Sequence, residues 1–300
     1  MKFTVALLFW AALAGAAFLS PCVAQAPETV HLATTYKPGS RLLYAISVKA
    51  TVDTSSGSAS REATLNTRAE AELQVLPGAT TNQFEIAARF TRYQTTVSAQ
   101  DPAQLATLAK IEAAGDKASI GMPPARFRMA GGIFTVVSRA AGVQYDQGVD
   151  MLGELVRNDD LPPGDATVGA QWTHPRTRNI PQTNVSMPLT LHCRLTALGR
   201  ENGAATAVIE ITSAGSAKLP PGSLSDSRAL ARQGLVPFGK FSFHTVEDAT
   251  YRVSDGVLLG TSSQTHSSVE IQLIGPSPQA RTMDSNIQST GTVRLESERQ

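Results

Sequence analysis

The sequence predicts a mainly β protein with minor helical content (α+β), built as a curved antiparallel sheet or half-barrel from two related units of strands, helix and hairpin. Three observations predict this fold. Apolar residues alternate with polar ones over long stretches, turn-forming residues separate these stretches, and one hairpin motif occurs twice. Alternation with a period of two is typical of strands that bury one face.

Residues 1–24 have the organisation of an export signal. Lys2 supplies a positive start, residues 5–19 form an apolar run, and residues 21–24 form a small-residue cleavage region. Because a membrane-spanning helix needs about 20 apolar residues, this run is too short for a comfortable span. We expect cleavage after Ala24, a mature chain without a transmembrane span, and a periplasmic or extracellular location.

Cys22 leaves a second possibility open. Residues 19–22 resemble a bacterial lipobox, in which the cysteine carries a lipid, although Pro21 stands where that motif has a small residue other than proline. If Cys22 is removed with the signal, Cys193 is the only remaining cysteine and no intramolecular disulfide can form.

Strand patterns begin soon after the signal. Apolar residues occupy every second position from Leu42 to Val52, and after a flexible turn at residues 55–58 the alternation returns over residues 63–75, which predicts a long hairpin. Further alternating segments lie at residues 84–97, 185–197, 205–211, 251–259 and 269–273, followed by a polar last strand over residues 282–295.

Three segments have helical character. The clearest begins with Asp101 as N-cap and Pro102 at the first helical position, and we expect it to end at Gly115. The second is short, from Ser225 or Asp226 to Gly234. The apolar residues of the first helix are Leu105, Leu108, Ala109 and Ile111. Those of the second are Ala229, Leu230 and Ala231.

The third helix is predicted over residues 147–157. Its residues divide between an apolar and an acidic side, with Val149, Leu152 and Val156 on one and Asp146, Asp150 and Glu154 on the other. Asp159 and Asp160 follow closely, so a calcium site is conceivable, but the EF-hand pattern is absent and a solvated acidic face is the preferred interpretation.

An internal duplication is predicted from the repeated hairpin. Residues 127–133 match residues 251–257 position by position, from an aromatic residue and Arg to Gly and a β-branched residue. Gly-centred hairpins are common in antiparallel sheets, so coincidence is the alternative. The predicted organisation is a signal peptide over residues 1–24, a first β-rich unit over 25–160 and a second over 161–300, within one continuous domain and with a junction at residues 159–165.

Composition and motifs exclude several functions. The net charge of +1 offers no basic surface for nucleic acid. Cys193 is in phase with apolar neighbours and is expected in the core, with His192 and Arg194 on the opposite face. No nucleotide-binding or nucleophile motif is present, so we expect no catalytic residue, no metal and no cofactor. The histidines lack metal-ligand spacing, although His244 and His266 are candidates for approach across a hairpin.

The most suggestive segment for function is residues 214–240, because a long connection inside a compact domain is often a lid or binding loop. If its apolar residues cover the concave face of the sheet, a hydrophobic ligand can lie beneath. The alternative is a loop that merely packs on its own sheet. The candidate ligand-binding residues are Leu224, Leu230, Leu235, Val236 and Phe238.

Three short motifs carry a resemblance. YKPGSRLLY (residues 36–44), LPPGDATVGAQW (161–172) and YRVSDGVLL (251–259) resemble an uncharacterised family of secreted bacterial β-rich proteins of unknown function. The order of strands and helices also resembles, at the level of architecture, the periplasmic lipoprotein carriers, whose half-barrel holds acyl chains beneath helical lids. Fold likeness alone assigns no activity.

These observations favour a non-enzymatic secreted or periplasmic protein that binds a lipid, an acyl chain or another apolar ligand between sheet and helices. The alternative is an envelope structural or interaction module that recognises another envelope protein. A ligand-lined cavity would favour the first, and a filled core with an apolar surface patch the second. A hydrolase without a recognisable motif ranks last.

Overall fold

The protein is described by a computed structural model. It describes residues 29–57, 59–77, 83–130, 133–138, 147–180, 183–224, 231–232, 234–275 and 281–299.

Two helices and thirteen strands have both of their ends within the described residues, and residues 231–232 are also helical. In chain order they are β1 (Thr29–Val30), β2 (Arg41–Ser56), β3 (Ala59–Pro77), β4 (Gln83–Ala99), α1 (Pro102–Gly121), β5 (Ala125–Ala130), β6 (Ile133–Ser138), α2 (Gln147–Val156), β7 (Ala166–Thr167), β8 (Gln171–Asn179), β9 (Ser186–Glu201), β10 (Ala204–Leu219), β11 (Val236–Arg252), β12 (Leu258–Ile274) and β13 (Arg281–Arg299).

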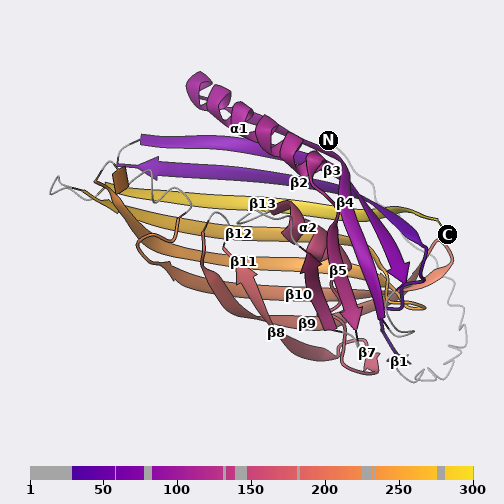
Figure 1. Ribbon diagram of the computed structural model, residues 1–300. Helices are drawn as coiled ribbons and strands as arrows, with labels where there is room; N and C mark the ends of the chain where they lie inside the picture. Colours follow the sequence, from indigo (N-terminus) through magenta and orange to yellow (C-terminus); the bar gives the residue numbers. More distant parts are fainter. Residues whose placement is uncertain are drawn as a thin grey trace, which may run out of the picture.

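Eleven strands form one antiparallel sheet in the order β6-β5-β4-β3-β2-β13-β12-β11-β10-β9-β8, and β1 pairs with β7 separately (Figure 1). The chain runs from the centre of the sheet to β6 at one edge, crosses to β8 at the other, and returns to the centre, where β13 pairs with β2. The sheet is open, with β6 and β8 outermost. The mainly β, antiparallel prediction is therefore confirmed.

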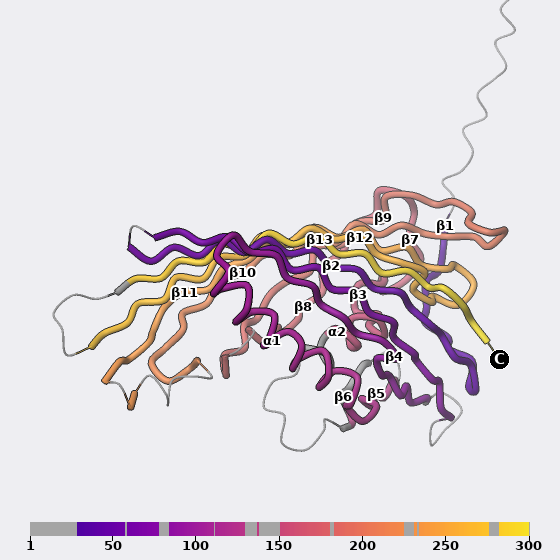
Figure 2. Tube along the Cα trace, turned by 90° about the horizontal axis from the view of Figure 1, so that it is seen from above, coloured from indigo at the N-terminus to yellow at the C-terminus, as the bar shows by residue number. Residues whose placement is uncertain are grey.

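The sheet is curved, and both helices lie on its concave side (Figure 2). Register shifts interrupt five of the strand pairings, those of β2 with β13, β3 with β4, β5 with β6, β9 with β10 and β11 with β12, for example between Thr250 and Tyr251. Bulges of this kind bend a strand and increase its twist. The curvature creates a concave face that the helices only partly fill.

Two hydrophobic clusters lie on the concave face, and both reach the end where α2 packs. Tyr44, Leu73, Ile86 and Phe127 belong to the cluster that includes α2, while Leu195, Ile209 and Tyr251 belong to the cluster under β9–β12. The Tyr44 hydroxyl donates to the Leu258 carbonyl oxygen at 2.9 Å, which connects the two halves of the sheet. We call this filled region, around α2, the closed end.

Helix α1 covers part of one sheet edge. Asp101 caps it by accepting from the Ala103 amide, as the sequence predicts, but the helix continues past Gly115 to Gly121. The predicted stop is wrong because contacts with β4 outweigh the modest helix penalty of one glycine, about 1 kcal/mol. Asp116, just beyond Gly115, accepts from the Thr95 amide of β4 at 2.9 Å, so α1 occupies an edge that β5 leaves unpaired.

Helix α2 confirms the third predicted helix, and Leu152, Leu155 and Val156 are buried. The second predicted helix lies mostly outside the described residues. None of the helices in the described part of the chain has the length and apolarity that a bilayer crossing requires.

One strand prediction needs correction. Residues 251–259 are not one strand, because β11 ends at Arg252 and β12 begins at Leu258, with Gly256 at φ 63° in the turn between them. The hairpin that the repeated motif predicts at this place is confirmed. The domain division and the duplication themselves stay predictions.

Candidate ligand-binding trough

Residues 214–240 contain the ends of two strands as well as a connection. This segment is not one long loop, because residues 214–219 belong to β10 and residues 236–240 to β11. The proline and glycine residues of this segment indicate a connection and conceal the strands at its two ends. The loop prediction is wrong at both ends, although a shorter connection between the two strands remains.

The five candidate residues lie in different environments. Leu224 forms an isolated β-bridge with Thr183 and packs against the cluster under β9–β12, and Leu235 is half-buried just before β11. Leu230 lies outside the described residues. Val236 and Phe238 alternate with Phe241 and Phe243 on β11, so they occupy the opposite face of the sheet. Their role in binding stays a prediction.

Helix α2 bridges the concave face from one edge region to the other. It packs against β4 and β5, where Gly153 lies over the Phe127 ring. On the other side, Glu154 accepts from Arg176 of β8 at 2.5 Å. A helix held at both margins of a curved sheet closes the space beneath it.

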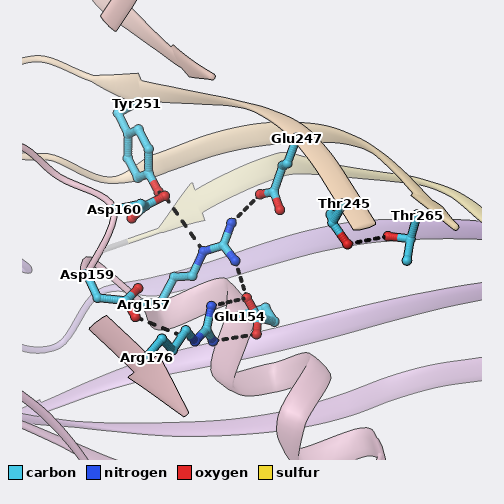
Figure 3. A network of polar contacts seen from close by, with 9 residues as sticks. All are labelled: Glu154, Arg157, Asp159, Asp160, Arg176, Thr245, Glu247, Tyr251 and Thr265. Carbon is cyan, nitrogen blue, oxygen red and sulfur yellow. Dashed lines mark hydrogen bonds and ion pairs between the residues drawn. The ribbon is translucent and has the colours of Figure 1, made fainter. Parts of the chain in front are cut away.

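A buried group of charges holds α2 in place (Figure 3). Arg157, with a side chain only 9% exposed, donates to Glu154 and to Glu247 of β11, and its Nε lies 3.7 Å from Asp160. Asp160 is fully buried and accepts from the Tyr251 hydroxyl. Arg176 also lies 3.6 Å from Asp159. We call Glu154, Arg157, Asp159, Asp160, Arg176, Glu247 and Tyr251 the arginine network.

The network shifts the pKa values of its carboxyl groups in different directions. Burial alone would raise the pKa of Glu154, but Arg176 and Arg157 lower it to about 2. For Asp160 and Glu247 burial dominates and raises the pKa above its usual value, although Arg157 acts against it. Of Glu154, Asp160 and Glu247, Glu154 is thus the most firmly ionised carboxylate.

These contacts decide the interpretation of the acidic residues. Glu154, Asp159 and Asp160 pair with arginines, so the preferred prediction of a solvated acidic face is wrong for them. The described residues contain no group of His, Cys, Asp and Glu side chains suited to a metal ion. Asp146 lies outside the described residues.

The other single residues follow their predictions. Cys193 is a free, buried thiol whose pKa burial raises to about 12, and His192 and Arg194 are exposed on the opposite face. His244 and His266 are register partners on the exposed, convex face. Tyr251 and Cys193 share the core under β9–β12, which gives the thiol no exposed position for chemistry.

Beyond α2 the concave face is open over β12, β13, β2, β3 and β4, whereas Leu219, Phe241 and Phe243 on β10 and β11 stay buried. Aliphatic side chains follow one another across five strands there, and each is only half-buried. Alternation and register place them on the same face as Tyr44 and Tyr251. This half-exposed surface, which we call the trough, consists of Ala50, Val52, Leu65, Val97, Val269, Ile271 and Ile287.

Hydroxyl side chains lie between the closed end and the trough. Thr67 and Thr95 contact each other across β3 and β4 at 3.1 Å, and Thr245 and Thr265 do so across β11 and β12 at 3.0 Å. Because these hydroxyls pair with one another, the trough begins at a polar boundary that is already satisfied.

Charge separates the two faces of the sheet. The convex face carries many acids, including Glu70, Glu72 and Glu210, which pair with arginines. On the concave face of strands β2–β4 and β8–β13, alternation places an acid among the described side chains. This acid is Glu247, and Arg157 pairs with it. The trough itself has no acidic side chain, which suits an apolar occupant.

Comparisons with known proteins were made by sequence and by structure. No protein-family model and no curated protein matches the sequence, so the family resemblance of the three short motifs stays unconfirmed. The solved structures include a study of lipid-protein interactions in lipovitellin, with 11% identity and a TM-score of 0.41, covering 88% of this chain and 26% of that chain.

A second similar structure is an outer membrane channel from Pseudomonas putida F1, with 10% identity and a TM-score of 0.23, covering 87% of this chain and 97% of that chain. The chain therefore spans about a quarter of the lipovitellin chain and nearly all of the channel. At these TM-scores the comparisons assign neither a family nor an activity.

Proposed function

We propose that the protein is a non-enzymatic, exported protein that binds a lipid or another apolar ligand in the trough. The observation that carries this proposal is the half-exposed aliphatic row on the concave side of the sheet, where a soluble domain ordinarily places its most buried residues. Burying such surface contributes roughly 25 cal/mol per Å², so an apolar chain laid along the row stabilises both partners.

The shape of the concave face supports the proposal. Val52 lies eight residues beyond Tyr44 on β2, so at about 3.3 Å per residue the trough reaches to roughly 26 Å from Tyr44 of the closed end. Helix α2 and the arginine network close one end, and α1 lies along β4 at one side. An elongated ligand fits this outline better than a compact one.

Uptake of a fluorescent fatty acid tests the proposal. Ile287→Asp places a charge in the trough, whereas Gln288→Asp places the same charge on the next residue, which is exposed on the convex face. We expect saturable uptake by the wild type and by Gln288→Asp, and a loss of uptake in Ile287→Asp. Equal uptake by both variants, or none by a folded wild type, would contradict the proposal.

A second candidate function rests on a different surface. Val236 and Ile274 face each other across β11 and β12 at the far end of the sheet and are 43% and 53% exposed. Exposed apolar pairs of this kind often mark contacts with another protein. An interaction module that recognises an envelope protein would use this surface and leave the trough empty.

Site-specific photo-crosslinking from position 236 in the envelope distinguishes the second candidate. One reproducible adduct at this position, combined with failure of fatty acid uptake, would favour the interaction module. Uptake without an adduct would favour the apolar-ligand protein.

A further inference from the structure

Most charged side chains described on the concave face of the sheet form ion pairs, but one arginine does not. Arg176 on β8 pairs with Glu154 and Asp159, Glu247 pairs with Arg157, and Arg61 lies 3.8 Å from Asp101. Arg178, two residues beyond Arg176 on the same strand, has no carboxylate within ion-pair distance among the described residues. Its guanidinium lies 4.6 Å from the centre of the Phe243 ring.

Arg178 stands where the arginine network ends and the apolar surface begins. It faces Met187 across β8 and β9, while Met187 and Phe243 both pack against Gly215. Phe243 is buried and stacks with Phe241, with ring centroids 6.1 Å apart. The guanidinium is exposed, so its donors can reach a ligand while Phe243 holds one face of the group.

A continuous row leads from Arg178 into the trough. Phe243, Ser267, Ile287 and Val52 are register partners on the neighbouring strands β11, β12, β13 and β2. At about 4.8 Å per strand, this row extends roughly 14 Å from Phe243 to Val52. Ser267 is the one polar member of this row, so an acyl chain whose first atoms lie at Arg178 can follow uncharged side chains across the sheet to Ile287 and Val52.

We propose that the ligand of the trough is an anionic amphiphile, with a carboxylate or phosphate headgroup bound by Arg178 and an acyl chain lying along the trough over Ile287 and Val52. This inference rests on the proposed function and names its ligand class. The guanidinium fork binds planar or tetrahedral oxyanions with two parallel hydrogen bonds. The trough itself carries no acidic side chain among the described residues. Arg178 acts on Glu154 only at longer range, without an ion pair, so its donors stay available for a headgroup while Arg176 is paired with Glu154 and Asp159.

The experiment compares ligands that share one chain and differ in the headgroup. Dodecanoate, dodecyl phosphate and dodecanol are titrated by calorimetry into the full-length mature protein below their micelle concentrations, and inorganic phosphate serves as the free anion. We expect both anionic amphiphiles to bind more tightly than dodecanol, and inorganic phosphate not to bind. Tighter binding of dodecanoate identifies a fatty acid headgroup, and tighter binding of dodecyl phosphate a phospholipid-type one.

Three variants assign the effect to Arg178. Arg178→Gln should weaken binding of the preferred anion by about tenfold or more, the worth of a charged hydrogen bond, and change dodecanol binding by less than about twofold. Arg178→Lys keeps the charge without the fork and should recover part of the affinity. Arg68→Gln, an exposed arginine on the convex face, is the matched control and should bind like the wild type.

The outcomes separate this inference from the proposed function. Equal binding of dodecanol and dodecanoate, or an equal loss of all ligands in Arg178→Gln, would overturn the assignment of an anionic headgroup and leave apolar binding intact. Binding of inorganic phosphate as tight as that of dodecyl phosphate would reduce Arg178 to a simple anion site. Absence of binding for every amphiphile to the folded protein would overturn both proposals.

Discussion

The two ends of the concave face are built from the same alternating strands and differ in what lies on them. At the closed end, α2 and the arginine network cover Tyr44, Leu73 and Tyr251, all of which are fully buried. At the open end, Val52, Leu65 and Ile287 are only half-buried. Alternation along the strands therefore determines which side chains lie on the concave face. Whether these side chains become part of the core depends on α2 and the arginine network, which cover only one end.

The closed end also differs in how it balances charge. Four acids and two arginines lie together under the sheet, with Asp160 fully buried. Buried ions cost several kcal/mol each unless they are paired. The position of α2 therefore depends on the ion pairs of Arg157 and Arg176, whereas the open end carries the exposed Arg178 without an ion partner among the described residues.

The largest effect should follow from breaking the arginine network. Arg157→Met leaves Glu247 and Asp160 without their cation, and removing one partner of a buried pair costs about 3–5 kcal/mol of unfolding free energy. Urea denaturation measures this change. Arg68→Met on the convex face is the control and should stay within about 0.5 kcal/mol of the wild type; a loss below about 1 kcal/mol for Arg157→Met would contradict the account of the closed end.

A pair of leucine truncations compares the two ends directly. Leu155 of α2 is 1% exposed, so Leu155→Ala should cost about 3 kcal/mol through lost burial and a cavity. Leu65 is half-buried at the open end, and Leu65→Ala should cost about 1 kcal/mol or less. Thermal or urea unfolding distinguishes them. Similar losses at the two positions would show that the open end is packed like the closed one.

Thiol labelling gives a third comparison. Burial raises the pKa of Cys193 to about 12, so the native protein should react very slowly with a thiol reagent at pH 8 and quickly in denaturant. Val52→Cys in a Cys193→Ala background should react quickly without denaturant, and more slowly once an apolar ligand is added. Fast labelling of native Cys193 would contradict its burial. Slow labelling of position 52 without ligand would contradict the accessibility of the open end.

The smallest effect concerns pH. The pKa of Glu154 falls from 4.5 to about 2 in the folded state, so its stabilisation is fully present above pH 4.5 and is lost as the pH falls toward 2. Asp160 and Glu247 have raised pKa values and act in the opposite direction. In Glu154→Gln, the free energy of unfolding should therefore decrease less between pH 4.5 and pH 2 than it does in the wild type. An unchanged slope of unfolding free energy against pH in this interval would contradict the assignment.

Local patterns predicted much of the fold. Alternation from Leu42 to Val52 gave β2, the Asp101 cap gave the start of α1, and the apolar spacing of Leu152 and Val156 gave α2. The phase of Cys193 with its neighbours also gave its burial correctly. Each of these signals depends on residues that are close in the chain, which is why they could be interpreted without a structure.

Non-local features escaped prediction. Strand β12 extends far before residue 269 because its Ser, Thr and Gln residues pair through the backbone without an apolar signal. Strand β8 contains Pro175, which an edge position tolerates. Arg157 meets Glu247 across ninety residues of sequence, so no spacing rule could identify the network, and the trough itself depends on where α2 ends.

Native mass spectrometry of the protein isolated from its own cell envelope, with lipid extraction from the same sample, tests the central claim most directly. The account predicts a mass adduct from an apolar, anionic ligand that persists in Gln288→Asp and disappears in Ile287→Asp while the fold is retained. Bare protein in every sample, together with no uptake of a fluorescent fatty acid, would contradict the claim that the open end of the concave face is a binding surface.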